Sequence, residues 1–325
     1  MERDVPFDQG DSCALVRILG ESVRPGEQLT LDLQVARLYT RTSVNIPVVV
    51  HRSMADGPVL LLLAGVHGDE VNGIDTVRRI LNDVGTRPIE KGTLVAIPVF
   101  NVFGFLNMKR QLPDGRDLNR YFPGSPKGSL ASRLAHALAK DVLPAVDLTI
   151  DLHSGSAQRY NLPHIRFTED DERSLELARV FDAPLIVQAP VRPRSIREML
   201  HQQGRSYLLF EGGKAQSLDH DAIRVAHRGI TRIMEHLGLW SGTSDLTQGT
   251  SMITGSRWVR AGHSGLFHPM MENGSKVSQG MILGLITDPY GEMAKQVKAP
   301  FDGTLFCVNT APVVNQGDAL FHLGY

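Results

Sequence analysis

Between residues 58 and 240, short apolar runs alternate with amphipathic segments, and this alternation limits the fold more than any other feature. Runs of this length suit buried strands, and the segments between them carry apolar residues at the spacing of one helix face. The predicted strands are 58–66, 93–101, 146–153, 183–189 and 206–213, and the predicted helices are 72–84, 129–146, 170–181, 195–204 and 220–239. This order predicts a mixed α/β fold, in which a mostly parallel sheet has helices on both faces.

The two ends of the chain have a different pattern. Apolar and polar residues alternate at 29–38 and 43–52, as they do in half-buried strands. Residues 1–45 are therefore expected to form a β-rich segment that packs on the α/β domain of residues 46–240. Residues 241–256 are rich in Ser, Thr and Gly, which predicts a linker.

Residues 257–325 show β-alternation, many glycines and no helical period, which predicts a small all-β domain. The stretches 265–286 and 303–323 form a weak internal repeat, and the domain resembles the lipoyl- and biotinyl-carrier sandwich. Carrier domains have the modified lysine at the hairpin tip between the two halves. The expected tip here, 288–291, contains no lysine, and Lys295 falls past it. A role in packing or in walling a site is therefore favoured over a carrier role.

Composition and charge exclude several classes of partner. The formal net charge is −1, so nothing indicates binding to nucleic acid or to an acidic membrane surface. The two cysteines, Cys13 and Cys307, form neither a disulfide framework nor a thiolate zinc site. Residues 1–12 do not resemble a signal peptide, and no apolar run reaches the roughly 20 residues that span a bilayer. We therefore expect a cytoplasmic protein without membrane contact. The oligomeric state stays open, and a homo-oligomer is compatible with the sequence.

In an open α/β sheet, ligands bind beyond the carboxyl ends of the strands, so polar residues at these ends are candidates for a site. His67 and Glu70 follow one predicted strand and are three residues apart. Imidazole and carboxylate are zinc ligands, and this spacing can bring both to one metal. The pair alone is weak evidence, because His-x-x-Glu is common in solvated loops. Gly65 and Gly68 strengthen it, since glycine lets the backbone approach closely.

Asp151 and His153 end the predicted strand 146–153. Strand alternation directs both side chains to the same side. His153 can then be a third metal ligand, with Asp151 orienting its imidazole or acting nearby. The alternative interpretation is an ordinary strand end followed by a serine that starts a helix.

Two further strand ends carry charged groups. The loop 107–124 contains Arg110 and the adjacent Asn119 and Arg120, and an amide beside a guanidinium suits the binding of a carboxylate. In isolation, the same pattern is equally typical of a solvated basic loop. Glu211 ends another buried strand and is followed by two glycines. Near a metal, such a carboxylate can be a general base; otherwise, it caps the next helix.

These motifs together resemble a known family. HGDE at 67–70, DLNR at 117–120, DLH at 151–153 and EGG at 211–213 are similar to the motifs of the succinylglutamate desuccinylase/aspartoacylase family of zinc amidohydrolases. The set also resembles the wider zinc carboxypeptidase superfamily. The resemblance covers roughly residues 45–240, and the C-terminal β-domain suits the family as well. It does not specify a substrate.

The resemblance implies one zinc ion per chain, held by His67, Glu70 and His153 with a position left for water. Such a zinc lowers the pKa of that water and polarises the scissile carbonyl. Glu211 is implied as the general base that takes the proton and passes it to the leaving amine. Arg110 matches the family arginine that stabilises the tetrahedral oxyanion.

The resemblance also implies residues that bind the substrate. Asn119 and Arg120 match the pair that binds a substrate carboxylate. Related enzymes carry a tyrosine near the site, and Tyr290 in the expected hairpin tip is the candidate for it here. Asp69 lies either close to the metal ligands or in an ordinary loop position.

The implied reaction is hydrolysis of an amide to a carboxylate and an amine. The leading hypothesis is a deacylase whose substrate is a small N-acyl amino acid or a related N-acyl amine. A metallocarboxypeptidase that acts on short peptides is the alternative within the same chemistry. A third hypothesis is a non-catalytic binding protein on the same fold. Loss of a zinc ligand or of Glu211 would favour it, and none of these residues is missing.

Overall fold

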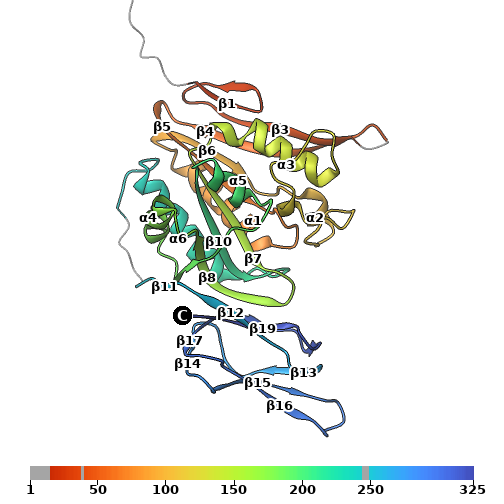
Figure 1. Ribbon diagram of the computed structural model, residues 1–325. Coiled ribbons are helices and arrows are strands. Elements are labelled where there is room, and N and C mark those ends of the chain that lie inside the picture. The colour runs from red at the N-terminus through yellow and green to blue at the C-terminus, as the bar shows by residue number, and fades with distance from the viewer. Residues whose placement is uncertain (1–14, 38–39, 244–248) are drawn as a thin grey trace, which may run out of the picture.

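The computed structural model describes residues 15–37, 40–243 and 249–325 (Figure 1). Cys13, the start of the predicted N-terminal segment and residues 244–248 of the predicted linker lie outside the described residues. The described part forms a large α/β body with a smaller all-β unit at one end, and the predicted fold class is confirmed (Figure 1). No helix in these ranges is long and apolar enough to cross a membrane.

Most helices of the described part begin after a short polar side chain that caps them. Their bounds are α1 Val71–Thr86, α2 Val102–Leu106, η1 Leu118–Arg120, α3 Leu130–Asp141, η2 Leu143–Ala145, α4 Glu172–Phe181, α5 Ile196–Gln202 and α6 His220–His236. In α3, α4, α5 and α6, the side chain of the preceding Ser or Asp accepts a hydrogen bond from the first turn. The starts of α1 and η2 have no such cap. The helix predicted at 129–146 is shorter than expected, since Pro144 follows α3 within η2.

One large mixed sheet runs through the body. Its strands there are β3 Gln28–Arg37, β4 Ser43–Arg52, β5 Ala55–Ala64, β6 Lys91–Ile97, β7 Leu148–Gly155, β8 Arg159–Phe167, β9 Leu185–Gln188, β10 Ser206–Lys214 and β11 Ser251–Ile253. Parallel pairs join β6, β5, β7 and β10, and antiparallel pairs join β3 to β4, β4 to β6 and β8 to β10. A separate hairpin, β1 Val16–Ile18 with β2 Glu21–Val23, lies at the N-terminal end.

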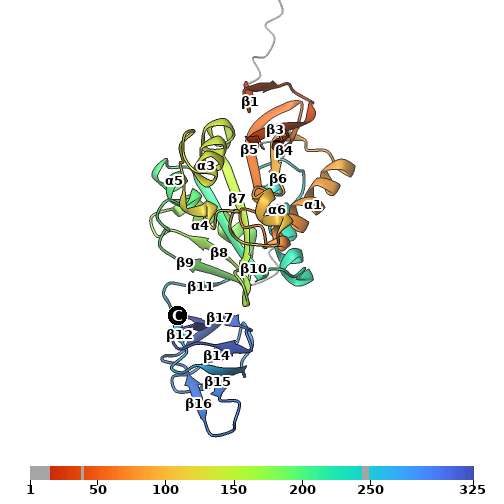
Figure 2. The ribbon, with the colours of Figure 1, turned by 90° about the vertical axis from the view of Figure 1, so that its right-hand side faces the viewer.

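Helices cover both faces of the sheet, as the strand–helix alternation predicts. Figure 2 shows α1 and α6 on one side of the sheet and α3 and α5 on the other. In β5, Leu60 and Leu62 belong to the core beneath α1 and α6, whereas Leu61 and Leu63 belong to the opposite core. Successive side chains of a strand point to opposite faces, so one unbroken apolar run supplies both cores.

The C-terminal unit consists of strands in two sheets. β12 Ser256–Arg260, β14 Lys276–Val277, β17 Gly303–Asn309 and β19 Ala319–Gly324 belong to the large sheet, and β13 Gly265–Pro269, β15 Ile282–Thr287, β16 Ala294–Lys298 and β18 Val313–Val314 form a second, four-stranded sheet. Phe267 and Ile286 of the second sheet share an apolar core with Leu305 and Phe321 of the first. Lys295 lies in β16, past the turn between β15 and β16.

The C-terminal unit is joined to the body through the sheet itself. β17 pairs antiparallel with β8, with Cys307 opposite Asn161, so the large sheet continues across both parts. The sequence prediction omits β8, because polar residues and a proline interrupt its apolar pattern. Residues 251–253, within the predicted linker, form β11 and pair with β9. This part of the predicted linker therefore belongs to the sheet.

Candidate active site

The loop between β5 and α1 holds two polar side chains below the surface. Gly65 has a left-handed backbone conformation with a φ of 62°, and Gly68 packs against the backbone of α2. A side-chain carbon at Gly68 would lie 2.0 Å from the carbonyl carbon of Gly104, which is far inside contact distance. Only glycine therefore lets this loop close. The closed loop buries His67 and Glu70, which are 3% and 1% exposed.

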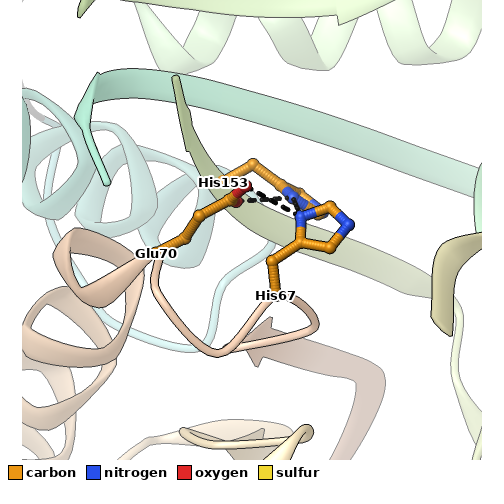
Figure 3. Close-up of side chains that lie close together, drawn as sticks. All are labelled: His67, Glu70 and His153. Carbon is orange, nitrogen blue, oxygen red and sulfur yellow. Dashed lines mark hydrogen bonds and ion pairs between the residues drawn. The ribbon is translucent and has the colours of Figure 1, made fainter. Parts of the chain in front are cut away.

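His67 and Glu70 meet His153 of β7 in one cluster (Figure 3). The Glu70 carboxylate lies 2.8 Å from Nδ1 of His67 and 2.9 Å from Nδ1 of His153, and the two Nδ1 atoms are 3.1 Å apart. The backbone N–H of Ser154 donates to the same carboxylate at 3.0 Å. Two imidazole nitrogens and a carboxylate thus face one point from a loop and a strand that are distant in sequence.

This donor set fits a zinc ion. Zinc binds imidazole nitrogen and carboxylate oxygen, and a tetrahedral zinc with bonds of about 2.0–2.1 Å keeps its donor atoms roughly 3.3 Å apart. The distances between the three donor atoms would have to increase by only about 0.2–0.5 Å to reach that spacing. Within the described ranges, no other trio of His, Cys, Asp or Glu side chains gathers in this way.

The cluster also shifts the proton affinity of its members. Burial acts to raise the pKa of Glu70, but the charges of His67 and His153 outweigh it and hold this pKa below its usual value. Burial acts to lower the pKa of His153, but the carboxylates of Asp151 and Glu70 raise it well above its usual value. Glu70 is therefore ionised at neutral pH, as metal ligation requires.

Asp151 lies directly behind His153, as strand alternation predicts. Its Oδ2 is 3.0 Å from His153 Nε2 and accepts a 2.6 Å hydrogen bond from the hydroxyl of Tyr207. Asp151 and Tyr207 are both buried. A carboxylate on the far nitrogen of a ligand imidazole orients the ring and raises its basicity.

Arg110 reaches the cluster from the loop that follows α2. Its Nη1 donates to Glu70 Oε1 at 3.1 Å and to Ser156 Oγ at 2.6 Å, and its Nη2 donates to Asp117 Oδ2 at 2.9 Å. The guanidinium is therefore fixed beside the proposed metal ligands by two carboxylates. A positive group held in this place can stabilise negative charge that develops on a bound carbonyl oxygen.

Asp117 has a place in the site that sequence reasoning missed. Its Oδ1 lies 3.3 Å from His67 Nε2, so Asp117 stands behind His67 much as Asp151 stands behind His153. The same oxygen accepts the backbone N–H of Asn119 at 3.0 Å. The available signal was the DLNR motif itself, in which Asp117 is the first residue.

Glu211 faces the same cavity from β10, which runs parallel to β7. It is paired in register with His153, and its Oε2 accepts a 2.9 Å hydrogen bond from Asn161 Nδ2. Burial raises the pKa of Glu211 and outweighs the opposing charge of Arg166. A carboxylate with a raised pKa suits proton transfer close to neutral pH.

Asn119 and Arg120 lie side by side in η1 at the cavity wall. Asn119 Oδ1 accepts the backbone N–H of Ile196 at 3.0 Å, which leaves its amide nitrogen as a donor for another group. Arg120 Nη1 donates to the backbone carbonyl of Asn119 at 2.5 Å. Both side chains are therefore held in place with donors remaining for a ligand.

These side chains line a cavity of about 250 Å³. Trp258, Cys307 and His322 of the C-terminal unit complete its wall. Two glutamates and six arginines line it, and the arginines are Arg110, Arg120, Arg159, Arg166, Arg192 and Arg197. Among these six, within the described part of the chain, only Arg110 forms an ion pair with a carboxylate. The cavity is therefore lined by both parts of the molecule and carries an excess of positive charge.

The sequence profile of the succinylglutamate desuccinylase/aspartoacylase catalytic domain matches residues 56–237, which is more than half of the chain. The chain belongs to this family. The resemblance that was inferred from the HGDE, DLNR, DLH and EGG motifs is thereby confirmed.

Known proteins match the chain over most of its length. It is 28% identical over 292 residues to N-alpha-acetyl-L-2,4-diaminobutyric acid deacetylase from Halomonas elongata, with 86% of this chain and 85% of that protein covered. A succinylglutamate desuccinylase/aspartoacylase structure from Rhodobacter sphaeroides has a TM-score of 0.82 at 25% identity, covering 100% and 98% of the two chains. The product-bound ectoine utilization protein EutE (DoeB) from Ruegeria pomeroyi has a TM-score of 0.85 at 24% identity, covering 97% and 99%. The family fold therefore includes the C-terminal unit.

The sequence analysis predicts eight site residues, and seven of them line the cavity: His67, Glu70, Arg110, Asn119, Arg120, His153 and Glu211. Tyr290 does not. Tyr290 is 87% exposed, in the turn between β15 and β16, where its backbone N–H donates to the Asp288 side chain at 2.7 Å. This turn lies at the end of the molecule far from the α/β body (Figure 1). Asp69 is buried and lines an adjoining groove rather than the cavity itself.

Proposed function

We propose that the chain is a zinc-dependent hydrolase that cleaves the amide bond of an N-acylated amino acid or a related small amine. The observation that carries this proposal is the convergence of His67, Glu70 and His153 at one point, with Glu211 in the same cavity. When bound to these three ligands, a zinc ion supplies Lewis acidity, which polarises a carbonyl group and makes water more acidic.

Glu211 is proposed as the general base. Its raised pKa and its position in register with His153 allow it to accept a proton from the attacking water and to donate it later to the leaving amine. Asn161 holds one carboxylate oxygen at 2.9 Å, so the other oxygen is the one proposed to exchange the proton.

The cationic groups have separate proposed roles. Arg110, held by Glu70 and Asp117, stabilises the negative charge that develops on the carbonyl oxygen. Arg120 and the free amide nitrogen of Asn119 bind a carboxylate of the substrate, since an arginine fork and an amide donor are complementary to its two oxygens.

A metallocarboxypeptidase that acts on short peptides remains the second candidate. A cavity of about 250 Å³ suits small substrates in either case, because it is below the range of roughly 300–1,000 Å³ that is usual for drug-sized ligands. The deacylase is favoured because the 28% identical relative from Halomonas elongata is a deacetylase. Comparison of N-acetyl and N-succinyl amino acids with dipeptides would separate the two activities.

Metal analysis followed by a deacylation screen tests the proposal. We expect about one zinc per chain and release of free amine from N-acyl amino acids. Glu211→Gln should keep the zinc and lower kcat by roughly 10²–10⁴-fold. Glu176→Gln, at an exposed position on α4, is the matched control and should retain full activity. Absence of stoichiometric zinc, together with unchanged activity in Glu211→Gln, would overturn the proposal.

A further inference from the structure

We propose that Asn161 acts in catalysis with both ends of its amide group: Nδ2 holds the carboxylate of Glu211, and Oδ1 accepts the N–H of the amide bond that is cleaved. The inference rests on the proposed function and deepens it. It adds a residue that touches the reacting atoms. It also specifies the substrate class as secondary amides, which carry an N–H, rather than esters, which do not.

Asn161 is fixed from both sides by the sheet. It lies in β8, where it is paired with Gly213 of β10 on one side and with Cys307 of β17 on the other. The pairing with β10 shifts register between Glu211 and Gly213, and Gly213 has a φ of 71°. Irregularities of this kind re-aim the side chains beside them. At this point in the sheet, the side chain of Asn161 meets the carboxylate of Glu211.

The contact with Glu211 determines which way the amide of Asn161 is turned. The distance from Nδ2 to Glu211 Oε2 is 2.9 Å. An ionised carboxylate only accepts hydrogen bonds, so the amide nitrogen faces Glu211 and the amide oxygen takes the other position. The two amide atoms are about 2.2 Å apart. Oδ1 therefore lies within about 5 Å of the Glu211 oxygen that Nδ2 binds.

Oδ1 of Asn161 is an acceptor that a bound molecule can reach. Asn161 lines the cavity and is 5% exposed. Its Oδ1 has no hydrogen bond within the described part of the chain, and protein atoms do not enclose it. Among the described residues, Asn119 is the other amide side chain in the cavity wall, but its oxygen accepts the backbone N–H of Ile196. Asn161 thus offers a neutral acceptor beside the proposed base.

The substrate brings a donor that needs such an acceptor. A secondary amide has one N–H, and a buried donor without a partner is costly. The arginines of the cavity can only donate. The free oxygen of Glu211 is proposed to take the proton of the attacking water. Oδ1 of Asn161 can therefore accept the amide N–H without competing with the base.

This hydrogen bond orients the nitrogen for protonation. With its N–H directed to Asn161, the nitrogen can turn the lone pair that develops during the reaction toward Glu211. It accepts on that lone pair the proton that Glu211 took from water. The C–N bond then breaks, its electron pair goes to the nitrogen, and the products are a primary amine and a carboxylic acid. One amide side chain thereby aligns the proton donor with the leaving group.

The experiment compares two substrates that differ only in the N–H. N-acetyl-L-alanine carries it, and O-acetyl-L-lactate has an ester oxygen in its place. Acetate release by the zinc-loaded full chain gives kcat/KM for both, and the amide/ester ratio of these values is the readout. Asn161→Leu should lower this ratio by on the order of 10-fold, since it removes the acceptor that only the amide uses. Partial misfolding of the variant would affect both substrates alike and leave the ratio unchanged.

Two further variants separate the two ends of the amide. Asn161→Asp keeps an oxygen acceptor but removes the donor to Glu211, so it should lower kcat/KM for both substrates and keep the ratio close to that of the wild type. Asn82→Leu, at an exposed position on α1, is the control and should match the wild type on both substrates. If Asn161→Leu lowers activity on the amide and on the ester by the same factor, Asn161 acts on Glu211 alone and the inference is overturned.

A failure of the proposed function can be told apart from a failure of this inference. If neither compound is cleaved, calorimetric titration of both gives their affinities instead. A preference of the wild type for the amide, abolished in Asn161→Leu, would then support the hydrogen bond, even if no N-acyl amino acid is cleaved and the proposed function fails. Equal affinities for the two compounds would overturn the inference, and cleavage of the ester alone would overturn both.

Discussion

Oδ2 of Asp151 lies 3.0 Å from Nε2 of His153, on the nitrogen opposite to the one that faces Glu70. The same oxygen accepts the hydroxyl of Tyr207 at 2.6 Å, so a chain of contacts runs from β10 through Asp151 to a proposed metal ligand. The carboxylate sets both the direction of the imidazole ring and the nitrogen that is free to bind a metal.

We expect Asp151→Asn to lower zinc affinity by on the order of 10- to 100-fold, because the amide cannot support the imidazole as a carboxylate does. Competition with a chromogenic zinc chelator measures the affinity. Tyr207→Phe removes only the hydroxyl that holds Asp151 and should have a smaller effect. Equal zinc affinity in Asp151→Asn and the wild type would show that His153 needs no carboxylate behind it.

Asp117→Asn should lower activity by on the order of 10-fold or more. It should also lower zinc affinity, but by a smaller factor than Asp151→Asn. Asp117 holds Arg110 as well as His67, and it is partly exposed at 3.3 Å from the ring, so its main contribution is to the position of the guanidinium. Asp114→Asn is the matched control, since Asp114 lies in the same loop and pairs with Arg116 outside the cavity. A control that loses as much activity as Asp117→Asn would point to a general effect of the loop.

Gly68→Ala should destabilise the fold by about 1–3 kcal/mol and weaken zinc binding, because the new methyl group meets the backbone of α2 and displaces the ligand loop. Chemical denaturation gives the free energy of unfolding. Gly85→Ala is the control: nothing lies within 4 Å of an added side-chain carbon there, and alanine in helix α1 should be neutral or stabilising. A Gly68→Ala protein as stable as the wild type would mean that α2 moves to admit the methyl group.

His322→Phe should make the protein less sensitive to acid. Burial, together with the charges of Arg166 and Arg192, lowers the pKa of His322 to about 3. The unfolded chain therefore binds the proton first, and stability falls as the pH drops from about 6.5 toward 3. By pH 5, the protonation of this histidine in the unfolded chain lowers the free energy of unfolding by about 2 kcal/mol. Phenylalanine cannot be protonated, and its ring can still stack on Trp258.

Denaturation midpoints at pH 7.5 and pH 5 measure this effect. The difference between the two midpoints should be smaller for His322→Phe than for the wild type. His236→Phe, at an exposed position at the end of α6, should leave the difference unchanged. If His322→Phe shows the same loss between the two pH values as the wild type, the imidazole does not contribute to acid sensitivity.

The sequence by itself determined the α/β body, and it predicted the residues that gather in the candidate metal site. Unbroken apolar runs such as 58–66 identify buried strands, and apolar residues at the spacing of one helix face identify helices such as 220–239, because both signals depend on residues close together in the chain. His67, Glu70 and His153 were predicted from their places at predicted strand ends together with the resemblance of their motifs to a known family.

Only the tertiary structure decided what surrounds these ligands. β8 has no clear apolar pattern, and its place follows from pairing with β10 on one side and β17 on the other. That pairing brings Arg166, Trp258 and His322 into one cavity, and it leaves Tyr290 in solvent at the far end of the C-terminal unit. The physical reason is that sheet register joins residues distant in sequence, so neither local periodicity nor motif spacing records which side chains face the substrate.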